Sequence, residues 1–258
     1  MRMARSVGLA ALAFLAGVTF AAAETALGPA LSYEGGFPAP GKVAFGGAFF
    51  GDYGPFYFRI SGEYSPMASR EEGYADWPPA SETDDRGYAA GEVLGVYSLG
   101  GATGLGPGFY YGFGRSVRDY YYYIYGPTLT LETEDFVAFQ HDFLAVAACR
   151  LQAEGTGKAV VWAGAGVSRF LRSGLLYSWY SDFYNPEYTY EESTSLDTRL
   201  TALAIGVGGD IRSGFAKHFG IYASTRFLFP TVDLSLTGYD GDKPDPNVAL
   251  AGGFFVAW

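Results

Sequence analysis

The chain has few residues that could carry catalysis. It contains two histidines, His141 and His218, and a single cysteine, Cys149. One cysteine allows neither an intramolecular disulfide nor a cysteine-cluster metal site. Asp142 follows His141 directly, and neighbouring side chains of a strand point to opposite faces, so the two cannot act as a contacting pair in an extended segment. Because a histidine without an orienting partner is a weak catalytic candidate, we expect no enzymatic activity.

Residues 155–158, Gly-Thr-Gly-Lys, match a phosphate-binding loop only in part. Gln152 stands where the first glycine of that motif is required, and Ala159 replaces the Ser or Thr that would hold magnesium. The segment is therefore predicted to be a hairpin turn, and we expect no cofactor.

Three aspartates, Asp240, Asp242 and Asp245, cluster in residues 238–246. Carboxylate oxygens at this spacing could hold calcium, but the rest of a calcium-loop pattern is missing. Surface loops are polar by default, so a solvated acidic turn is favoured and no metal site is assigned.

The N-terminal segment has the order of a secretory signal peptide. Arg2 and Arg5 precede an uncharged, mainly apolar run over residues 7–20, and three alanines precede Glu24. We predict cleavage after residue 23 and a single mature domain over residues 24–258. The mature part contains no apolar run of about 18 residues, so no transmembrane helix is expected.

The composition indicates a membrane protein of another kind. Aromatic residues make up 18% of the chain, with 21 Tyr and 21 Phe, and there are 37 Gly. The net charge of −10 argues against a nucleic-acid partner, which would need a basic face. Backbone groups in lipid must be satisfied within the structure, so without a spanning helix a closed β-barrel is the remaining option.

The pattern of strands and turns predicts the size of that barrel. Short Gly-rich or charged turns at residues 51–54, 99–103, 154–158 and 213–217 separate segments of period-two alternation. They give four hairpins, and residues 248–258 add a ninth strand. Bacterial single-chain barrels have even strand numbers, so a further strand should precede Lys42, where residues 27–37 alternate. The sequence therefore predicts an all-β, closed antiparallel transmembrane barrel of about ten strands. The alternative is eight strands with an irregular N-terminal arm.

Charged residues within these strands should point into the barrel, since a charge facing hydrocarbon at mid-depth costs roughly 2–4 kcal/mol. Arg59 and Glu63 alternate with large aromatic residues and are the firmest lumen candidates. Further lumen candidates, from strands with less regular alternation, are Glu92, Arg199, Asp210 and Arg226. Small barrels have an interior that side chains can fill, so these charges should help to close it.

The last residues carry the one resemblance to a known class of proteins. Phe254, Val256 and Trp258 fall on one face of an alternating segment that ends on an aromatic residue. This segment of about a dozen residues resembles the C-terminal insertion signal of bacterial outer-membrane β-barrels. The resemblance implies a small Gram-negative barrel, monomeric and inserted by the barrel-assembly machinery, with outer-membrane lipid and lipopolysaccharide as partners. A soluble sandwich or lipocalin-like barrel, with the faces inverted, is the alternative.

Tyr-rich segments over residues 118–125 and 177–184 should form surface-exposed loops. Tyr121, Tyr123, Trp179 and Tyr184 are candidate recognition residues, since Tyr and Trp are enriched at recognition surfaces. The other interpretation, which is favoured because girdles are a general feature of barrels, is an interfacial aromatic girdle with strand extensions. Outer-membrane proteases of the omptin type use an Asp-x-His pair, which this chain lacks. We therefore expect a non-enzymatic structural or recognition protein. A narrow, porin-like channel for small solutes and a lipid- or peptide-modifying enzyme are the alternatives.

Overall fold

The computed structural model describes residues 24–35, 42–74, 80–124, 128–152, 157–182, 189–195, 197–216, 218–233 and 246–257. The signal peptide predicted at residues 1–23 lies outside them. Almost all described residues are in strands: β1 Glu24–Gly35, β2 Lys42–Tyr53, β3 Phe56–Tyr74, β4 Ala80–Gly100, β5 Thr103–Ile124, β6 Thr128–Gln152, β7 Gly157–Asp182, β8 Thr189–Ser195, β9 Thr198–Ala216, β10 Phe219–Asp233 and β11 Asn247–Ala257. In the described part of the chain, no helix is long and apolar enough to span a membrane.

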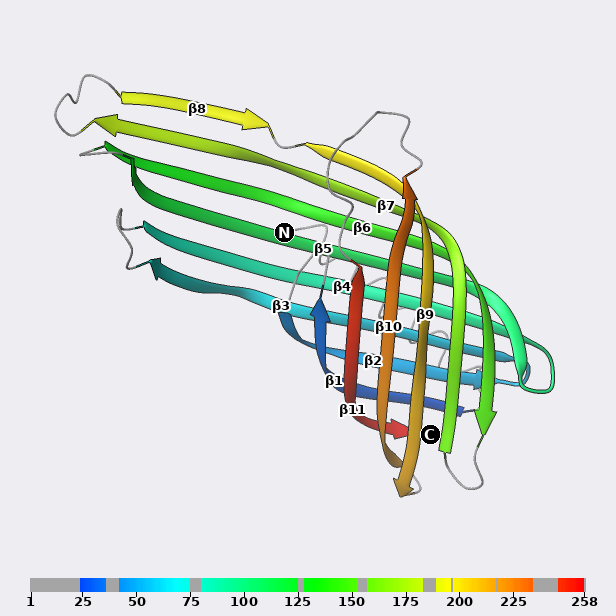
Figure 1. Cartoon of the computed structure of the whole chain (residues 1–258). Helices are drawn as coiled ribbons and strands as arrows, with labels where there is room; N and C mark the ends of the chain where they lie inside the picture. The colour runs from blue at the N-terminus through cyan, green and yellow to red at the C-terminus, as the bar shows by residue number, and fades with distance from the viewer. Residues whose placement is uncertain are drawn as a thin grey trace, which may run out of the picture.

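Ten of these strands form one closed antiparallel barrel (Figure 1). Each strand pairs with its neighbours around the ring, and the pairing of β6 with β7 closes it. β1 pairs with both β2 and β11, so the first and last strands meet at one seam. The all-β, ten-stranded prediction is confirmed. The eight-stranded alternative is wrong, because its irregular N-terminal arm is a fully paired strand.

Alternation sorts the side chains into two faces. Along β9, Leu200, Ala202 and Ala204 are buried in the interior, while Leu203 and Ile205 are exposed on the outer surface.

The short turns between β2 and β3 and between β4 and β5 use backbone conformations that favour glycine, with φ of 53° at Gly54 and 59° at Gly101. Short turns of such barrels face the periplasm, which orients the molecule.

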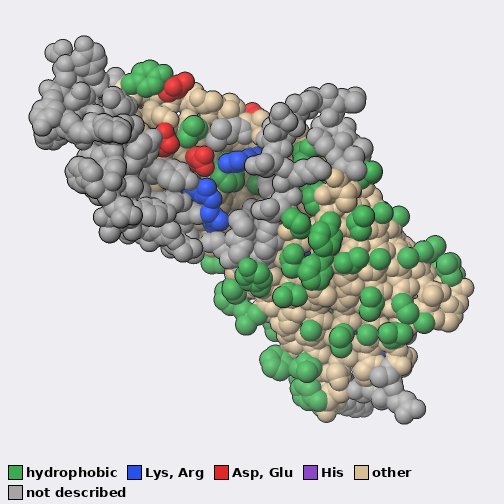
Figure 2. Space-filling view, viewed as in Figure 1, with side chains coloured by type: hydrophobic (Ala, Val, Ile, Leu, Met, Phe, Trp, Pro, Cys, Tyr) green, Lys and Arg blue, Asp and Glu red, His purple; other side chains and the backbone are tan. Residues whose placement is uncertain are grey.

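The outer surface of the barrel is apolar. Hydrophobic side chains cover the face of the barrel seen in Figure 2. Exposed large hydrophobic residues of the barrel include Leu31, Phe45, Phe143, Phe215 and Phe254. Hydrophobic surface of this extent is not stable in water, and a closed ring of paired strands leaves no unsatisfied backbone edge for lipid. The barrel lies in the bacterial outer membrane. The inverted faces of a soluble barrel are not seen.

The strands differ greatly in length. β1, β2 and β11 have 11 or 12 residues, whereas β3 to β7 have 19 to 26. About 9–11 residues are enough to cross a bilayer. The upper parts of β3 to β7 therefore continue beyond the barrel as one sheet, which β8 extends at its edge (Figure 1). We call this part the extracellular sheet.

The extracellular sheet shows that the Tyr-rich segments are strand extensions over most of their length, and the expectation of loops there is wrong. Residues 118–124 belong to β5 and pair with β6, with Tyr121 opposite Leu131, and residues 175–181 belong to β7 and pair with β8. Tyrosine and threonine fit a pleated, half-buried surface well, so a Tyr-rich composition favours strand extension as much as an exposed loop.

The seam between β1 and β11 generates a prediction. A Cβ added at Gly28 would overlap the backbone carbonyl of Phe254 on β11, and backbone cannot rotate away as a side chain can. We expect Gly28→Ala to lower the free energy of unfolding by about 1–3 kcal/mol, as overpacking does. The measurement is urea unfolding of the refolded barrel, followed by gel mobility and tryptophan fluorescence.

The matched control is Gly91→Ala on β4, where the added Cβ would lie 3.6 Å from the carbonyl oxygen of Ser61, an ordinary contact. Equal stability of the two variants would show that the seam is not tightly packed at Gly28.

Candidate functional site

The candidate site is the barrel interior, which is packed with side chains. A cluster of buried apolar residues fills much of it, including Phe50, Leu94, Val96, Val146, Trp162, Leu228 and Phe255. These come from strands all around the ring, so they meet across the lumen. An interior filled by side chains is expected for a barrel of this size.

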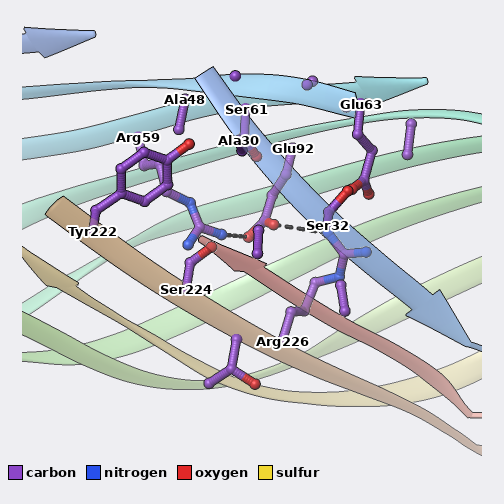
Figure 3. Close-up of a pocket in the computed structure, with 18 residues that line it drawn as sticks. Ala30, Ser32, Ala48, Arg59, Ser61, Glu63, Glu92, Tyr222, Ser224 and Arg226 are labelled. Carbon is purple, nitrogen blue, oxygen red and sulfur yellow. Dashed lines mark hydrogen bonds and ion pairs between the residues drawn. The ribbon is translucent and has the colours of Figure 1, made fainter. Parts of the chain in front are cut away.

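Four charged residues form a network within this packed interior, which we call the lumen network. Arg59, which is 2% exposed, forms ion pairs with both Glu92 and Asp210. Arg226 forms an ion pair with Glu92 at 2.8 Å and donates a hydrogen bond to Oδ1 of Asn247 at 3.0 Å. Glu92 thus lies between two guanidinium groups (Figure 3). Two cations and two anions alternate, so the charges balance.

The register explains the ion pair of Arg59 with Glu92, whereas the other two ion pairs of the network cross the lumen. Glu92 of β4 pairs with Ser61 of β3, two residues from Arg59, so Arg59 and Glu92 are diagonal neighbours on the inner face. Asp210 lies on β9, beside β10, which carries Arg226. The ion pairs of Arg59 with Asp210 and of Arg226 with Glu92 therefore join β3 to β9 and β4 to β10 across the barrel.

Tyrosines continue the lumen network in both directions. The hydroxyl of Tyr57 donates to Asp210 at 2.9 Å. The guanidinium of Arg226 lies over the ring of Tyr110 at 4.0 Å, and the hydroxyls of Tyr110 and Tyr88 are 3.0 Å apart. Tyr88 then donates to Glu63 at 3.2 Å. The cavity beside the network measures about 30 Å³, which is room for very few water molecules.

A second buried polar group contains Asp142, which accepts hydrogen bonds from Gln140 at 2.8 Å and from Ser168. A serine beside a carboxylate would need a histidine to act as a nucleophile. His141 instead lies on the outer face, with its ring 5.0 Å from that of Tyr111. Asp142 and Ser168 are also almost completely inaccessible, at 0% and 1% exposure, so a substrate has no access to them.

The periplasmic mouth contains a further charged group that the sequence analysis missed. Asp52 contacts Arg150 at 2.8 Å, Arg212 at 3.0 Å and Lys158 at 3.4 Å. These residues line a cavity of about 630 Å³ that opens at this end of the barrel. Each lies within a few residues of a short turn or at the end of a strand, and the distance along the chain gives no sign of their convergence.

The structure brings four of the predicted lumen charges, Arg59, Glu92, Asp210 and Arg226, into one network, and Glu63 joins it through Tyr88. Arg199 does not belong: it is exposed on the outer face, next to the buried Leu200. The assignment of Arg199 to the lumen is wrong, since Arg199 and Asp210 lie an odd number of positions apart on β9 and face opposite sides.

The remaining predicted residues have no place in the interior. Phe254 and Val256 are exposed on the outer face, at 66% and 44%, while Trp258 lies outside the described residues. Trp179 is half-buried on β7, opposite Glu191 of β8. Tyr121 and Tyr123 are in β5, but their side chains are outside the described part, as is all of Tyr184. The acidic loop at residues 238–246 is also outside, apart from Pro246. The described residues contain no group of His, Cys, Asp and Glu that could hold a metal ion.

No protein-family description and no curated protein matches this chain. Among solved structures it is similar to the translocator domain of autotransporter NalP from Neisseria meningitidis, with a TM-score of 0.44, 10% identity and coverage of 99% of this chain and 97% of that one. It is also similar to the outer-membrane protease OmpT from Escherichia coli, with a TM-score of 0.38, 7% identity and coverage of 91% of this chain and 94% of that one. Neisserial surface protein A is similar with a TM-score of 0.31, 12% identity and coverage of 90% of this chain and 95% of that one. At these levels the comparisons carry no argument about activity or partners.

The lumen network generates a stability prediction. Glu92→Gln removes the carboxylate between Arg59 and Arg226 and leaves two buried cations with one anion. We expect a loss of about 3–5 kcal/mol in the free energy of unfolding, as when one partner of a buried ion pair is removed. The measurement is the urea midpoint of the refolded barrel.

The control for this variant is Glu63→Gln, which affects one part-buried hydrogen bond from Tyr88 and should cost about 1 kcal/mol or less. If Glu92→Gln were no more destabilising than Glu63→Gln, the ion pairs would contribute little to holding the barrel together.

Proposed function

We propose that this protein is a non-enzymatic outer-membrane scaffold that displays the extracellular sheet for recognition at the cell surface, with a closed lumen. The observation that carries the proposal is the ion pair of Arg59 with Asp210, which spans the lumen from β3 to β9 within the packed interior. An open channel would need this contact to break and the buried aromatic residues around it to move.

The extracellular sheet supports a role in recognition because it has two open edges. Among the described residues, β8 pairs with β7 alone. The pairing of β2 with β3 ends at Tyr64, so within the same residues β3 above this point pairs only with β4. An unpaired strand edge offers backbone donors and acceptors to an extended partner segment. Tyr190 and Glu192 are exposed on β8, and the hydroxyl of Tyr190 donates to Glu192 at 2.9 Å.

The surface of the extracellular sheet differs from that of the barrel. Acidic and basic side chains gather on the protruding part, whereas hydrophobic side chains cover the barrel (Figure 2). Arg115 and Asp135 form a two-contact ion pair there, at 3.0 and 3.3 Å, and Thr133 donates to Asp119 at 2.7 Å. These cross-strand contacts are typical of a sheet in water, and they support a folded surface above the membrane.

Electrical recording tests the closed lumen. In planar bilayers the wild-type protein should give no stable conductance, whereas porins of 16–18 strands give steady channels. Shortening two adjacent lumen side chains in Tyr57→Ala/Arg59→Ala should increase brief, irregular openings. Arg199→Ala, on the outer face, serves as the control and should behave like the wild type. Steady channels of porin size from the wild type would contradict the scaffold and favour a solute channel.

Surface labelling tests the display of the extracellular sheet. In a Cys149→Ser background, Ser193→Cys on the exposed β8 should react with a membrane-impermeant maleimide on intact cells. The matched control is Ala102→Cys in the exposed turn between β4 and β5, which should react only after the outer membrane is permeabilised. The opposite labelling pattern would place the sheet in the periplasm and exclude a role at the cell surface.

A further inference from the structure

The apolar outer surface of the barrel is interrupted by basic side chains at one level. On β6, β7 and β9 the outward residues Phe143, Val167 and Leu203 are exposed and apolar. The next outward positions, two residues along in each strand toward the extracellular sheet, are His141, Arg169 and Thr201. Arg199 follows Thr201 on the same face of β9, and both arginines are exposed.

The register places these basic side chains side by side. Arg169 lies directly opposite His141 on one side and Thr201 on the other. Arg199 pairs with Leu171, so Arg169 and Arg199 are diagonal neighbours on the outer face, with about 7–8 Å between such positions. Two guanidinium groups at this spacing can reach the oxygens of one phosphate or of two neighbouring phosphates.

Their depth is that of lipid headgroups. Arg169 lies about twelve residues beyond Gly157, the first residue of β7, and 9–11 residues are enough to cross the bilayer. An arginine at the midplane would cost roughly 2–4 kcal/mol, but near the interface this penalty falls to about 0–1 kcal/mol. The two arginines therefore lie where the hydrocarbon ends and the outer leaflet presents its charged groups.

Within the described residues, no hydrogen bond or ion pair reaches the guanidinium of Arg169 or Arg199. Arg115, on the same outer face, shows the contrast, because its charge is already paired with Asp135. Asp197 interacts electrostatically with Arg199, and its pKa is lowered by hydrogen bonds from Ser173 and Ser195 and by the charge of Arg199. Among the described residues, no ion pair with an acidic side chain is found for Arg169.

We propose that Arg169 and Arg199 bind phosphate groups of lipopolysaccharide in the outer leaflet. Guanidinium groups bind phosphate through paired hydrogen bonds, with geometry that a lysine ammonium does not match. The outward direction of the two side chains and their depth select a lipid headgroup over a soluble anion. The site is independent of the closed lumen and of the extracellular sheet's partner.

The test measures lipopolysaccharide binding by the full mature protein folded into phosphatidylcholine nanodiscs. The removal variant is Arg169→Gln/Arg199→Gln, and Arg169→Lys/Arg199→Lys keeps the charge. The control, Arg115→Gln/Asp135→Asn, removes a paired arginine and carboxylate from the same face without changing the net charge. Folding of each variant is verified by gel mobility before native mass spectrometry counts bound lipid.

We expect the removal variant to bind lipopolysaccharide about tenfold more weakly or worse, since each basic residue near an anionic surface contributes several-fold. The lysine variant keeps the charge but loses the paired hydrogen bonds, so its affinity should lie between those of the wild type and the removal variant, and the control should bind like the wild type. Dephosphorylated lipopolysaccharide should bind the wild type and the removal variant equally weakly. Equal binding of intact lipopolysaccharide by both, or full displacement by millimolar inorganic phosphate, would overturn the proposal.

Discussion

The closed interior depends on the pairing of Arg59 with Asp210 across the lumen. A single buried charge is very costly in a packed interior, so each member of the network is stable there only because its partners are present. Because Glu92 is shared between Arg59 and Arg226, the contacts tie β3 and β4 to β9 and β10. Any opening of the lumen must separate opposite charges at several points at once, and this favours a rigid scaffold over a pore.

A rigid barrel also explains how long strands can leave the membrane without losing order. β6 and β7 have 25 and 26 residues, more than twice the length that a bilayer requires, and they stay paired along their whole length. Their lower halves are fixed by the packed interior, so the upper halves start from a defined register. The contact of Arg172 with the ring of Phe136, at 3.9 Å, continues cross-strand packing above the barrel.

Much of this architecture follows from the sequence. Alternation can be recognised within each single strand, and the even number of strands follows from the closure of the barrel. The ten strands and the inward direction of Arg59 and Glu63 could be predicted in this way. The partner of Arg59 could not, since Asp210 lies 151 residues away and only the circular order of strands brings them together. The sequence leaves the Tyr-rich segments open between loops and strand extensions, because their composition is typical of both.

Arg199 was wrongly assigned to the lumen because its depth in the membrane was not considered. The rule that charges avoid hydrocarbon holds at mid-depth and weakens toward the interfaces. Alternation along β9 fixes the outward direction of Arg199, because the buried Asp210 has the opposite parity. Both statements are satisfied together only if the hydrocarbon ends below Arg199. The same residue that contradicts an inward assignment therefore marks the upper boundary of the membrane, and an exposed cation at that boundary faces the anionic headgroups of the outer leaflet.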